Sequence, residues 1–202
     1  MGPPVPLDLE PPPFASFAEL EREALACVKC PLSERRTQVV FGVGDPTANL
    51  MFVGEGPGEQ EDLQGIPFVG RAGQLLTRLV EGIGLARDDV YIANVVKCRP
   101  PGNRDPLPLE IDSCRPYLEG QLRFIDPVVV VTLGNFATKL LLETKEGITK
   151  VRGREFPFRD RAVLIPTFHP SAVLRNGGTA LAQARADFVL VKRALARRHA
   201  RA

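Results

Sequence analysis

The sequence predicts a three-layer α/β fold with a mainly parallel central sheet. Four short apolar runs, each suited to a strand buried on both faces, alternate with stretches of helical spacing. Strands that alternate with helices imply βαβ crossovers, which produce parallel sheets covered by helices. The length of 202 residues, with 44% hydrophobic and 25% charged residues, suits one globular domain.

The elements follow from local signals along the chain. Residues 1–13 contain six prolines, which prevent helix and ladder formation, so we expect a disordered arm there. Ser16 can cap a first helix, and glycines close two later helical stretches. We expect one domain over residues 14–198 and a frayed tail over 199–202. The expected strands are 50–53, 90–96, 128–133 and 163–167, and the expected later helices are 72–81, 135–143 and 179–198.

The charge is unevenly distributed along the chain. The formal net charge is +2, but residues 175–202 carry seven Lys or Arg and one acid, a net +6, which leaves −4 for the rest. Such a basic stretch can face phosphates, or it can be a solvated helix face. The longest purely aliphatic run, 128–131, is far too short to span a membrane, and no signal pattern precedes it. We therefore expect a cytoplasmic protein with no membrane association.

Three of the expected strands lead into segments whose residue types suit ligand binding or catalysis. Gly54 to Asp62 lacks the third glycine of a dinucleotide fingerprint, and it suits either close approach to a flat ligand or a plain turn. Asn94 follows the apolar residues 90–93 and offers a donor and an acceptor that suit the edge of a nucleobase, although such residues also cap strands and turns. His169 can stabilise a developing negative charge or can simply bond to backbone in a loop.

Four cysteines match the number of ligands in a tetrahedral metal or iron–sulfur site. Cys27 and Cys30 form a Cys-x-x-Cys pair. Another 67 residues separate Cys30 from Cys98, and 15 more separate Cys98 from Cys114, which lies at the expected start of a helix. Zinc ribbons usually bring two close pairs, so an iron–sulfur cluster is at least as consistent with this spacing as zinc. Buried thiols without a metal remain an alternative.

Taken together, these residues resemble the family 4 uracil-DNA glycosylases, the iron–sulfur branch of the uracil-DNA glycosylase superfamily. The resemblance covers residues 16–195 in order. The motifs that carry it are Cys27-x-x-Cys30, Gly54 to Asp62, Pro67 to Gly70, Asn94 to Pro101, Cys114 and His169-Pro170-Ser171.

The resemblance implies a three-layer α/β/α sandwich with a four-stranded, mainly parallel sheet. It also implies a monofunctional enzyme that flips uracil out of DNA and hydrolyses its N-glycosidic bond to leave an abasic site. By similarity, Phe68 stacks on uracil, Asn94 bonds its N3–H and O4, and His169 stabilises charge on O2. A [4Fe–4S] cluster is implied on Cys27, Cys30, Cys98 and Cys114.

The sequence departs from the best-known branch of that superfamily at two positions. Gly56 stands where that branch has an aspartate that positions water, so the backbone of residues 54–58, with Gly54 and Glu55, is expected to hold the water. Gly58 stands where that branch excludes the methyl group of thymine, and Glu61 is the expected substitute.

The segment after His169 is expected to contact DNA. By resemblance, Ser171 contacts DNA, Leu174 inserts into the base stack and Arg175 contacts a phosphate. The expected partner is uracil-containing DNA, single- or double-stranded, bound by a monomer. Two alternatives are a non-enzymatic iron–sulfur or zinc module that binds nucleic acid, and an enzyme that prefers hypoxanthine or xanthine.

Overall fold

The computed structural model describes residues 13–159 and 161–199, so the predicted arm, apart from Pro13, and tail residues 200–202 lie outside the described residues. The helices are α1 (Phe17–Leu25), α2 (Glu59–Gln64), α3 (Arg71–Glu81), α4 (Pro108–Ile125), α5 (Asn135–Leu141), α6 (Ile148–Val151), α7 (Pro170–Asn176) and α8 (Gly178–His199). The strands are β1 (Val43–Gly44), β2 (Leu50–Gly54), β3 (Tyr91–Asn94), β4 (Val129–Leu133), β5 (Phe156–Phe158) and β6 (Ala162–Thr167).

Within the described residues, the strands form one six-stranded sheet in the order β1-β3-β2-β4-β6-β5. The four inner strands pair in parallel, and the two outer strands pair with them antiparallel. The predicted α/β class is therefore confirmed, whereas the predicted number of four strands is wrong. The two strands that were not predicted are both at the edges of the sheet.

Physical reasons account for the missed edge strands. β1 has only two residues, too few for any periodic signal. β5 contains Pro157, which cannot donate to a ladder and which is tolerated at a sheet edge. The predicted strand 90–96 ends early, at Asn94, and residues Val95 and Val96 instead donate to the carbonyls of Gly54 and Glu55.

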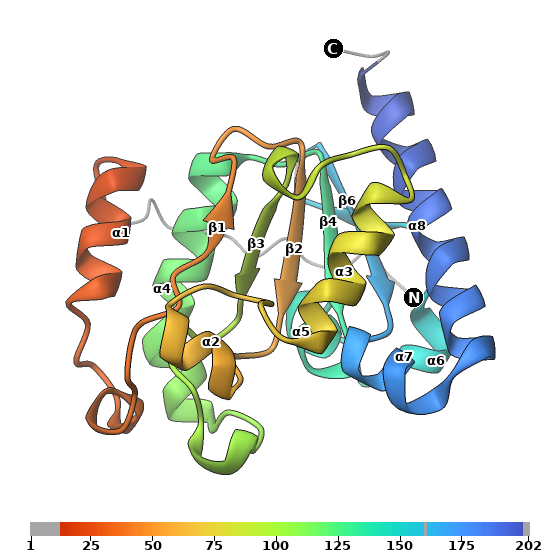
Figure 1. Cartoon of the computed structure of the whole chain (residues 1–202). Helices are drawn as coiled ribbons and strands as arrows, with labels where there is room; N and C mark the ends of the chain where they lie inside the picture. Colours follow the sequence, from red (N-terminus) through yellow and green to blue (C-terminus); the bar gives the residue numbers. More distant parts are fainter. Residues whose placement is uncertain (1–12, 160, 200–202) are drawn as a thin grey trace.

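Successive side chains along a strand point to opposite faces of the sheet, where they pack into two separate apolar cores. In β2, Met51 and Val53 pack with residues of α1, α4 and α5, while Leu50 and Phe52 pack with residues of α3, α7 and α8. Helices therefore cover both faces of the sheet, with α1 and α4 on one side and α8 on the other (Figure 1). Ser16 caps α1 as predicted, because its Oγ accepts a hydrogen bond from the Glu19 N–H at 3.1 Å.

This arrangement brings several loops to one edge of the sheet. The carboxyl ends of β2, β3, β4 and β6 point the same way, and α2, α5 and α7 follow there, at the lower edge of the view (Figure 1). Open parallel sheets bind ligands at this edge. No helix in the described part of the chain combines the length and apolar character needed to cross a membrane.

Candidate functional site

A cleft of about 610 Å³ opens at the carboxyl edge of the sheet. Its walls come from the loop after β2, the loop before α3, the end of β3 and the first turn of α7. Most of the predicted site residues line it: Glu55, Gly56, Glu61, Phe68, Asn94, His169, Ser171 and Arg175. The fold therefore joins segments that lie more than a hundred residues apart in the sequence.

Asn94 presents an unpaired acceptor at the base of this cleft. It is the last residue of β3, it is 1% exposed, and its Oδ1 is buried without a hydrogen-bond partner. Gly54 is its neighbour across the β2–β3 ladder. A Cβ on Gly54 would lie 2.4 Å from that Oδ1 and 2.8 Å from Cζ of Phe68, so only glycine lets the amide and the ring approach each other. A buried acceptor without a partner is costly, and a ligand N–H would satisfy it.

Phe68 supplies an aromatic wall beside the amide. The residue is 8% exposed, and its ring centroid lies 5.6 Å from that of His169, with the two planes tilted by 34°. Its φ of 55° falls in the left-handed region, which costs a non-glycine residue of order 1–3 kcal/mol. Gly73 permits this conformation, because a Cβ at position 73 would lie only 1.7 Å from the Phe68 carbonyl oxygen and would collide with it.

Hydrogen bonds on both sides hold the Phe68 backbone in this conformation. The Glu61 Oε1 accepts from the N–H groups of Val69 and Gly70, at 3.0 and 3.2 Å. The Arg87 Nη2 donates to the Pro67 carbonyl at 2.7 Å. Arg87 was not predicted as a site residue, because it lies in a short 3₁₀ turn with no motif around it. The aromatic wall is therefore fixed before any ligand binds.

His169 is a neutral hydrogen-bond donor in this arrangement. It caps α7, a helix that was not predicted, and its Nδ1 accepts from the Ser171 N–H at 3.2 Å and lies 2.7 Å from the Ser171 Oγ. An Nδ1 that accepts leaves the proton of the neutral ring on Nε2. Burial lowers the pKa of His169 to about 4, and the charge of Arg175 acts in the same direction while Glu61 opposes it.

Glu55 and Gly56 form the rim of the cleft after β2. A Cβ on Gly56 would lie 2.8 Å from Cγ2 of Val96, so a larger residue there would require movement. Burial raises the pKa of Glu55 to about 7, and repulsion from the Asp105 carboxylate and a hydrogen bond to it add to the rise. Asp105 was not predicted as a site residue. Asp105 comes close to Glu55 because residues 99–108 fold back toward the cleft, and no local sequence pattern predicts that path.

The exposed end of α7 separates two hollows. Arg175 is exposed and lines the cleft, whereas Leu174 is 40% exposed and lines a neighbouring groove instead. The predicted DNA-contacting residues therefore stand together on one short helix at the mouth of the cleft.

The four cysteines gather at the side of the sheet that α1 and α4 cover. Cys98 and Cys114 are buried, Cys30 packs against Cys98, and Cys27 belongs to the core that contains Cys114. Cys114 lies in the middle of α4, not at the start of a helix as predicted. In the described part of the chain, no three His, Cys, Asp or Glu side chains are close enough to hold a single metal ion.

Hydrogen-bond donors approach two of these sulfurs. The Arg36 Nη1 lies 3.5 Å from the Cys98 Sγ, and the Lys97 backbone N–H donates to the Cys114 Sγ at 3.3 Å. The fully buried Lys97 Nζ in turn donates to the Asn94 carbonyl at 2.7 Å. One residue, Lys97, therefore links the cysteine region to the strand end that carries Asn94.

Comparisons with known proteins find related sequences over most of the chain. The family profile described as the uracil DNA glycosylase superfamily matches residues 41–194. A type-4 uracil-DNA glycosylase of Sulfurisphaera tokodaii is 48% identical over 169 residues, covering 80% of this chain and 77% of the relative. The type-4 uracil-DNA glycosylase of Thermotoga maritima is 52% identical over 151 residues (74% and 79%), and that of Archaeoglobus fulgidus is 45% identical over 166 residues (79% and 83%).

Proposed function

Because the chain belongs to the type-4 uracil-DNA glycosylases of the uracil DNA glycosylase superfamily and excises uracil in DNA repair, we propose that it is monofunctional and leaves an abasic site. In this reaction the C1′–N1 bond breaks, uracil leaves with the bonding electrons, and water supplies the oxygen that bonds to C1′. The observation that supports uracil as the base held in the cleft is the unpaired Asn94 Oδ1, which lies beside Phe68 and His169.

Uracil fits this cleft as a flipped base. A base inside a duplex hides its glycosidic bond, so the nucleotide must rotate out before it can react. The Phe68 ring stacks on the base, and the buried Asn94 Oδ1 accepts from uracil N3–H while the amide nitrogen donates to O4. Cytosine has no N–H at N3, so it would leave the Asn94 Oδ1 unpaired and would bind less well.

The His169 Nε2–H stabilises the negative charge that develops on uracil O2 as the bond breaks. The low pKa of His169 keeps the ring neutral at physiological pH, and the Ser171 N–H fixes its tautomer. A donor that is already oriented requires little reorganisation when the charge appears. Most of the rate acceleration is therefore assigned to stabilisation of the leaving group.

Glu55 and the backbone around Gly56 hold the attacking water in our proposal. The Glu55 carboxyl lines the cleft, and its pKa of about 7 allows it to be charged at neutral pH. The carboxylate then orients the water and balances positive charge that develops on the sugar. A glycine at position 56 leaves room for the side chain of Val96, because a Cβ at that position would lie 2.8 Å from the Val96 Cγ2.

Glu61 excludes thymine in our proposal. A Cβ on Gly58 would lie 2.6 Å from the Glu61 Oε2, so the Glu61 carboxylate fills the space that a side chain at position 58 would occupy. The same carboxylate accepts from the backbone beside Phe68, which keeps it in place. A methyl group directed at this carboxylate would desolvate it without offering a hydrogen bond.

DNA binds across the exposed end of α7 in our proposal. Leu174 fills the gap left by the flipped nucleotide, while Ser171 and Arg175 contact the phosphate backbone. The exposure of Leu174 supports this role, because a large apolar side chain at a cleft mouth gains burial only when a ligand arrives.

We also propose that Cys27, Cys30, Cys98 and Cys114 hold a [4Fe–4S] cluster. In support, charges on Cys30 and Cys27 add to the rise that burial causes in the pKa of Cys98, so these thiols lie within electrostatic reach of one another. Four cysteine thiolates are also the usual ligand set of a [4Fe–4S] cluster. When bound, the cluster would crosslink the segment after α1, helix α4 and the loop after β3.

Metal analysis tests the cofactor proposal. Anaerobically purified protein should contain about four irons and four acid-labile sulfides per chain. Stoichiometric zinc without iron in natively expressed protein would contradict it.

An abasic-site assay tests the proposed reaction. Matched oligonucleotides that carry uracil, hypoxanthine or thymine at one position are incubated with the protein, and half of each sample is then treated with alkali. The proposal predicts intact strands before alkali and cleavage after alkali, for uracil and not for thymine. Strand breaks without alkali would contradict monofunctional action, and equal product from thymine would contradict the role of Glu61.

A further inference from the structure

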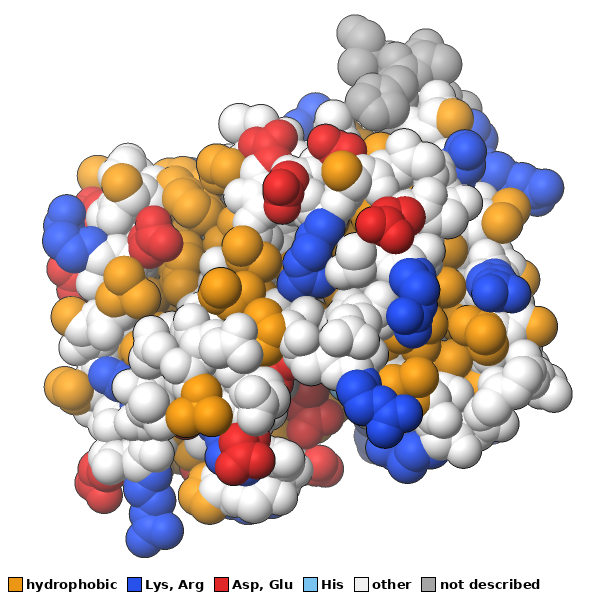
Figure 2. Space-filling view, viewed as in Figure 1, with side chains coloured by type: hydrophobic (Ala, Val, Ile, Leu, Met, Phe, Trp, Pro, Cys, Tyr) orange, Lys and Arg blue, Asp and Glu red, His pale blue; other side chains and the backbone are white. Residues whose placement is uncertain are grey.

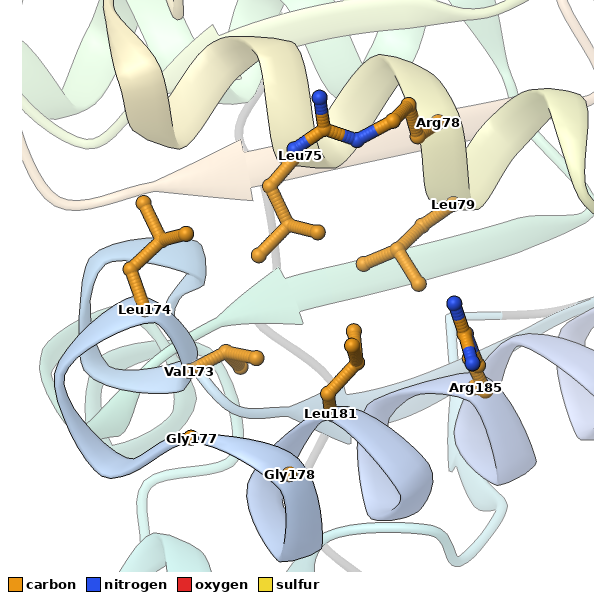
Figure 3. A pocket seen from close by; sticks show the side chains of 9 residues that line it. All are labelled: Leu75, Arg78, Leu79, Val173, Leu174, Gly177, Gly178, Leu181 and Arg185. Atoms are coloured by element: carbon orange, nitrogen blue, oxygen red, sulfur yellow. The ribbon is translucent and has the colours of Figure 1, made fainter.

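A second hollow lies beside the cleft, on the other side of α7. It is a groove of about 300 Å³ between α3, α7 and α8, and we call it the Leu174 groove. Its apolar walls are Leu75, Leu79, Val173, Leu174 and Leu181, whose side chains point into the groove (Figure 3). None of the roles proposed above for the flipped base uses it.

Two arginines add positive charge to this apolar groove. Arg78 of α3 and Arg185 of α8 lie on opposite walls, both exposed (Figure 3). Among the described residues, neither forms an ion pair. The space-filling view shows Lys and Arg side chains flanking the apolar surface on this side of the molecule (Figure 2). Two unpaired cations at one groove favour an anionic ligand.

The groove is continuous with the proposed DNA interface. Leu174 lines the groove, and its neighbour Arg175 lines the cleft, so the two hollows share α7 as their dividing wall. A seven-residue helix is about 10 Å long. This length corresponds to the axial rise of roughly three nucleotides of one strand.

From this geometry we propose that the DNA interface continues past Leu174 into the groove, where Arg78 and Arg185 contact phosphates beyond the flipped nucleotide. The proposal rests on the proposed function, because it takes DNA as the ligand of the cleft. The leucines meet the apolar faces of deoxyribose, and the two guanidinium groups meet phosphate oxygens. Continuity with the cleft favours DNA over an acidic peptide, which would not need to adjoin the mouth of the cleft.

The salt dependence of DNA binding tests this proposal. The affinity of the Arg78→Ala/Arg185→Ala double variant for a uracil duplex and for an undamaged duplex is measured between 50 and 200 mM salt. The slope of log K against log salt is negative, and each lost phosphate contact reduces its magnitude by about 0.9, so we expect the magnitude to fall by about two with both duplexes. Thermal melting shows whether the variant is folded.

A matched control removes the same charge elsewhere. Arg22 of α1 and Arg123 of α4 are exposed on the helices of the opposite face of the sheet, so Arg22→Ala/Arg123→Ala should leave the slope unchanged. An unchanged slope in the groove variant would overturn the proposal, because the two arginines would then make no phosphate contacts. An equal decrease in both variants would also overturn it, because net charge alone would then explain the effect. Failure of the proposed function would appear separately, as absence of excision by the wild-type protein.

Discussion

The two sides of the cleft are built in different ways. On the strand side, Asn94 and Gly54 end two paired strands, and Phe68 is held in a left-handed conformation by hydrogen bonds from both directions. On the helix side, Leu174 and Arg175 stand exposed on a helix of seven residues. The residues that we propose to recognise the base are therefore held in place by the protein itself, whereas those that we propose to contact DNA are surface groups that would gain burial only in a complex.

His169 belongs to both sides, and this fits the role that we propose for it. It caps the exposed helix, yet its ring is packed against Phe68 and held neutral by burial. A donor in this position would stabilise negative charge that develops on the base while α7, the helix that it caps, is in contact with DNA.

The largest predicted effect comes from removing this donor. If His169 acts only as negative charge develops on O2, His169→Ala should slow single-turnover excision by about 10²- to 10³-fold and leave duplex affinity within about twofold. Rapid-quench kinetics and fluorescence anisotropy separate the two quantities. A loss confined to affinity would place His169 on the DNA-contacting side only, and the electrostatic role would pass to the backbone of the loop after β2.

The next largest effect concerns pH and the strand side of the cleft. The pKa of Glu55 is raised to about 7, so the carboxylate that our proposal requires is mostly absent at pH 6 and mostly present at pH 8. The single-turnover rate should therefore rise about tenfold across this range. The pKa of His169, about 4, lies below it, so His169 should not contribute to the rise.

Glu55→Gln provides the control for the pH profile. This variant should be slower than the wild type at pH 8 and should lose the rise with pH. The effect of pH on the stability of the fold has the opposite sign to its effect on the rate of excision. Because the folded pKa of Glu55 exceeds the unfolded value, the ionised group opposes folding as pH rises from about 4.5 to 7, and Glu55→Gln should relieve this cost. A profile that still rises in the variant would assign the titration to another group.

The smallest effect is predicted on the helix side. Leu174→Ala should slow excision from duplex DNA by about fivefold, since it loses part of the burial of one leucine side chain. Excision from single strands should change little, because no base pair has to be opened there. Val189 is a similarly exposed apolar residue on α8 that lines neither hollow, and Val189→Ala is the matched control. Equal losses on both substrates would show that Leu174 does not fill the gap in the duplex.

The sequence predicted much of the strand side, because its signals are local. An apolar run followed by a polar residue is visible without the fold, and the parallel-sheet rule then brings Asn94 and the loop after β2 together. The same rule placed His169 at this edge. The helix that His169 caps was missed, although Pro170 at its first position is a recognised helix-start signal.

The supporting contacts could not be predicted in the same way. Arg87 reaches Pro67 across 20 positions of sequence, and Asp105 approaches Glu55 across 50, so both contacts depend on loop paths that carry no periodic pattern. Lys97 lies within a predicted motif, but its side-chain partner Gln121 lies on α4, and only the packed helix reveals that pair. Long-range polar contacts of this kind are set by tertiary structure and not by local propensity.

Binding of free uracil tests most directly the claim that base recognition is preformed and separate from the DNA contacts. Calorimetry or chemical-shift titration at millimolar uracil requires neither DNA nor chemistry. We predict that wild-type and Leu174→Ala proteins bind uracil with the same Kd and that Asn94→Ala binds it at least about tenfold more weakly, through loss of a buried hydrogen bond. Equal Kd values in wild type and Asn94→Ala, or no binding by the wild-type protein, would contradict the account.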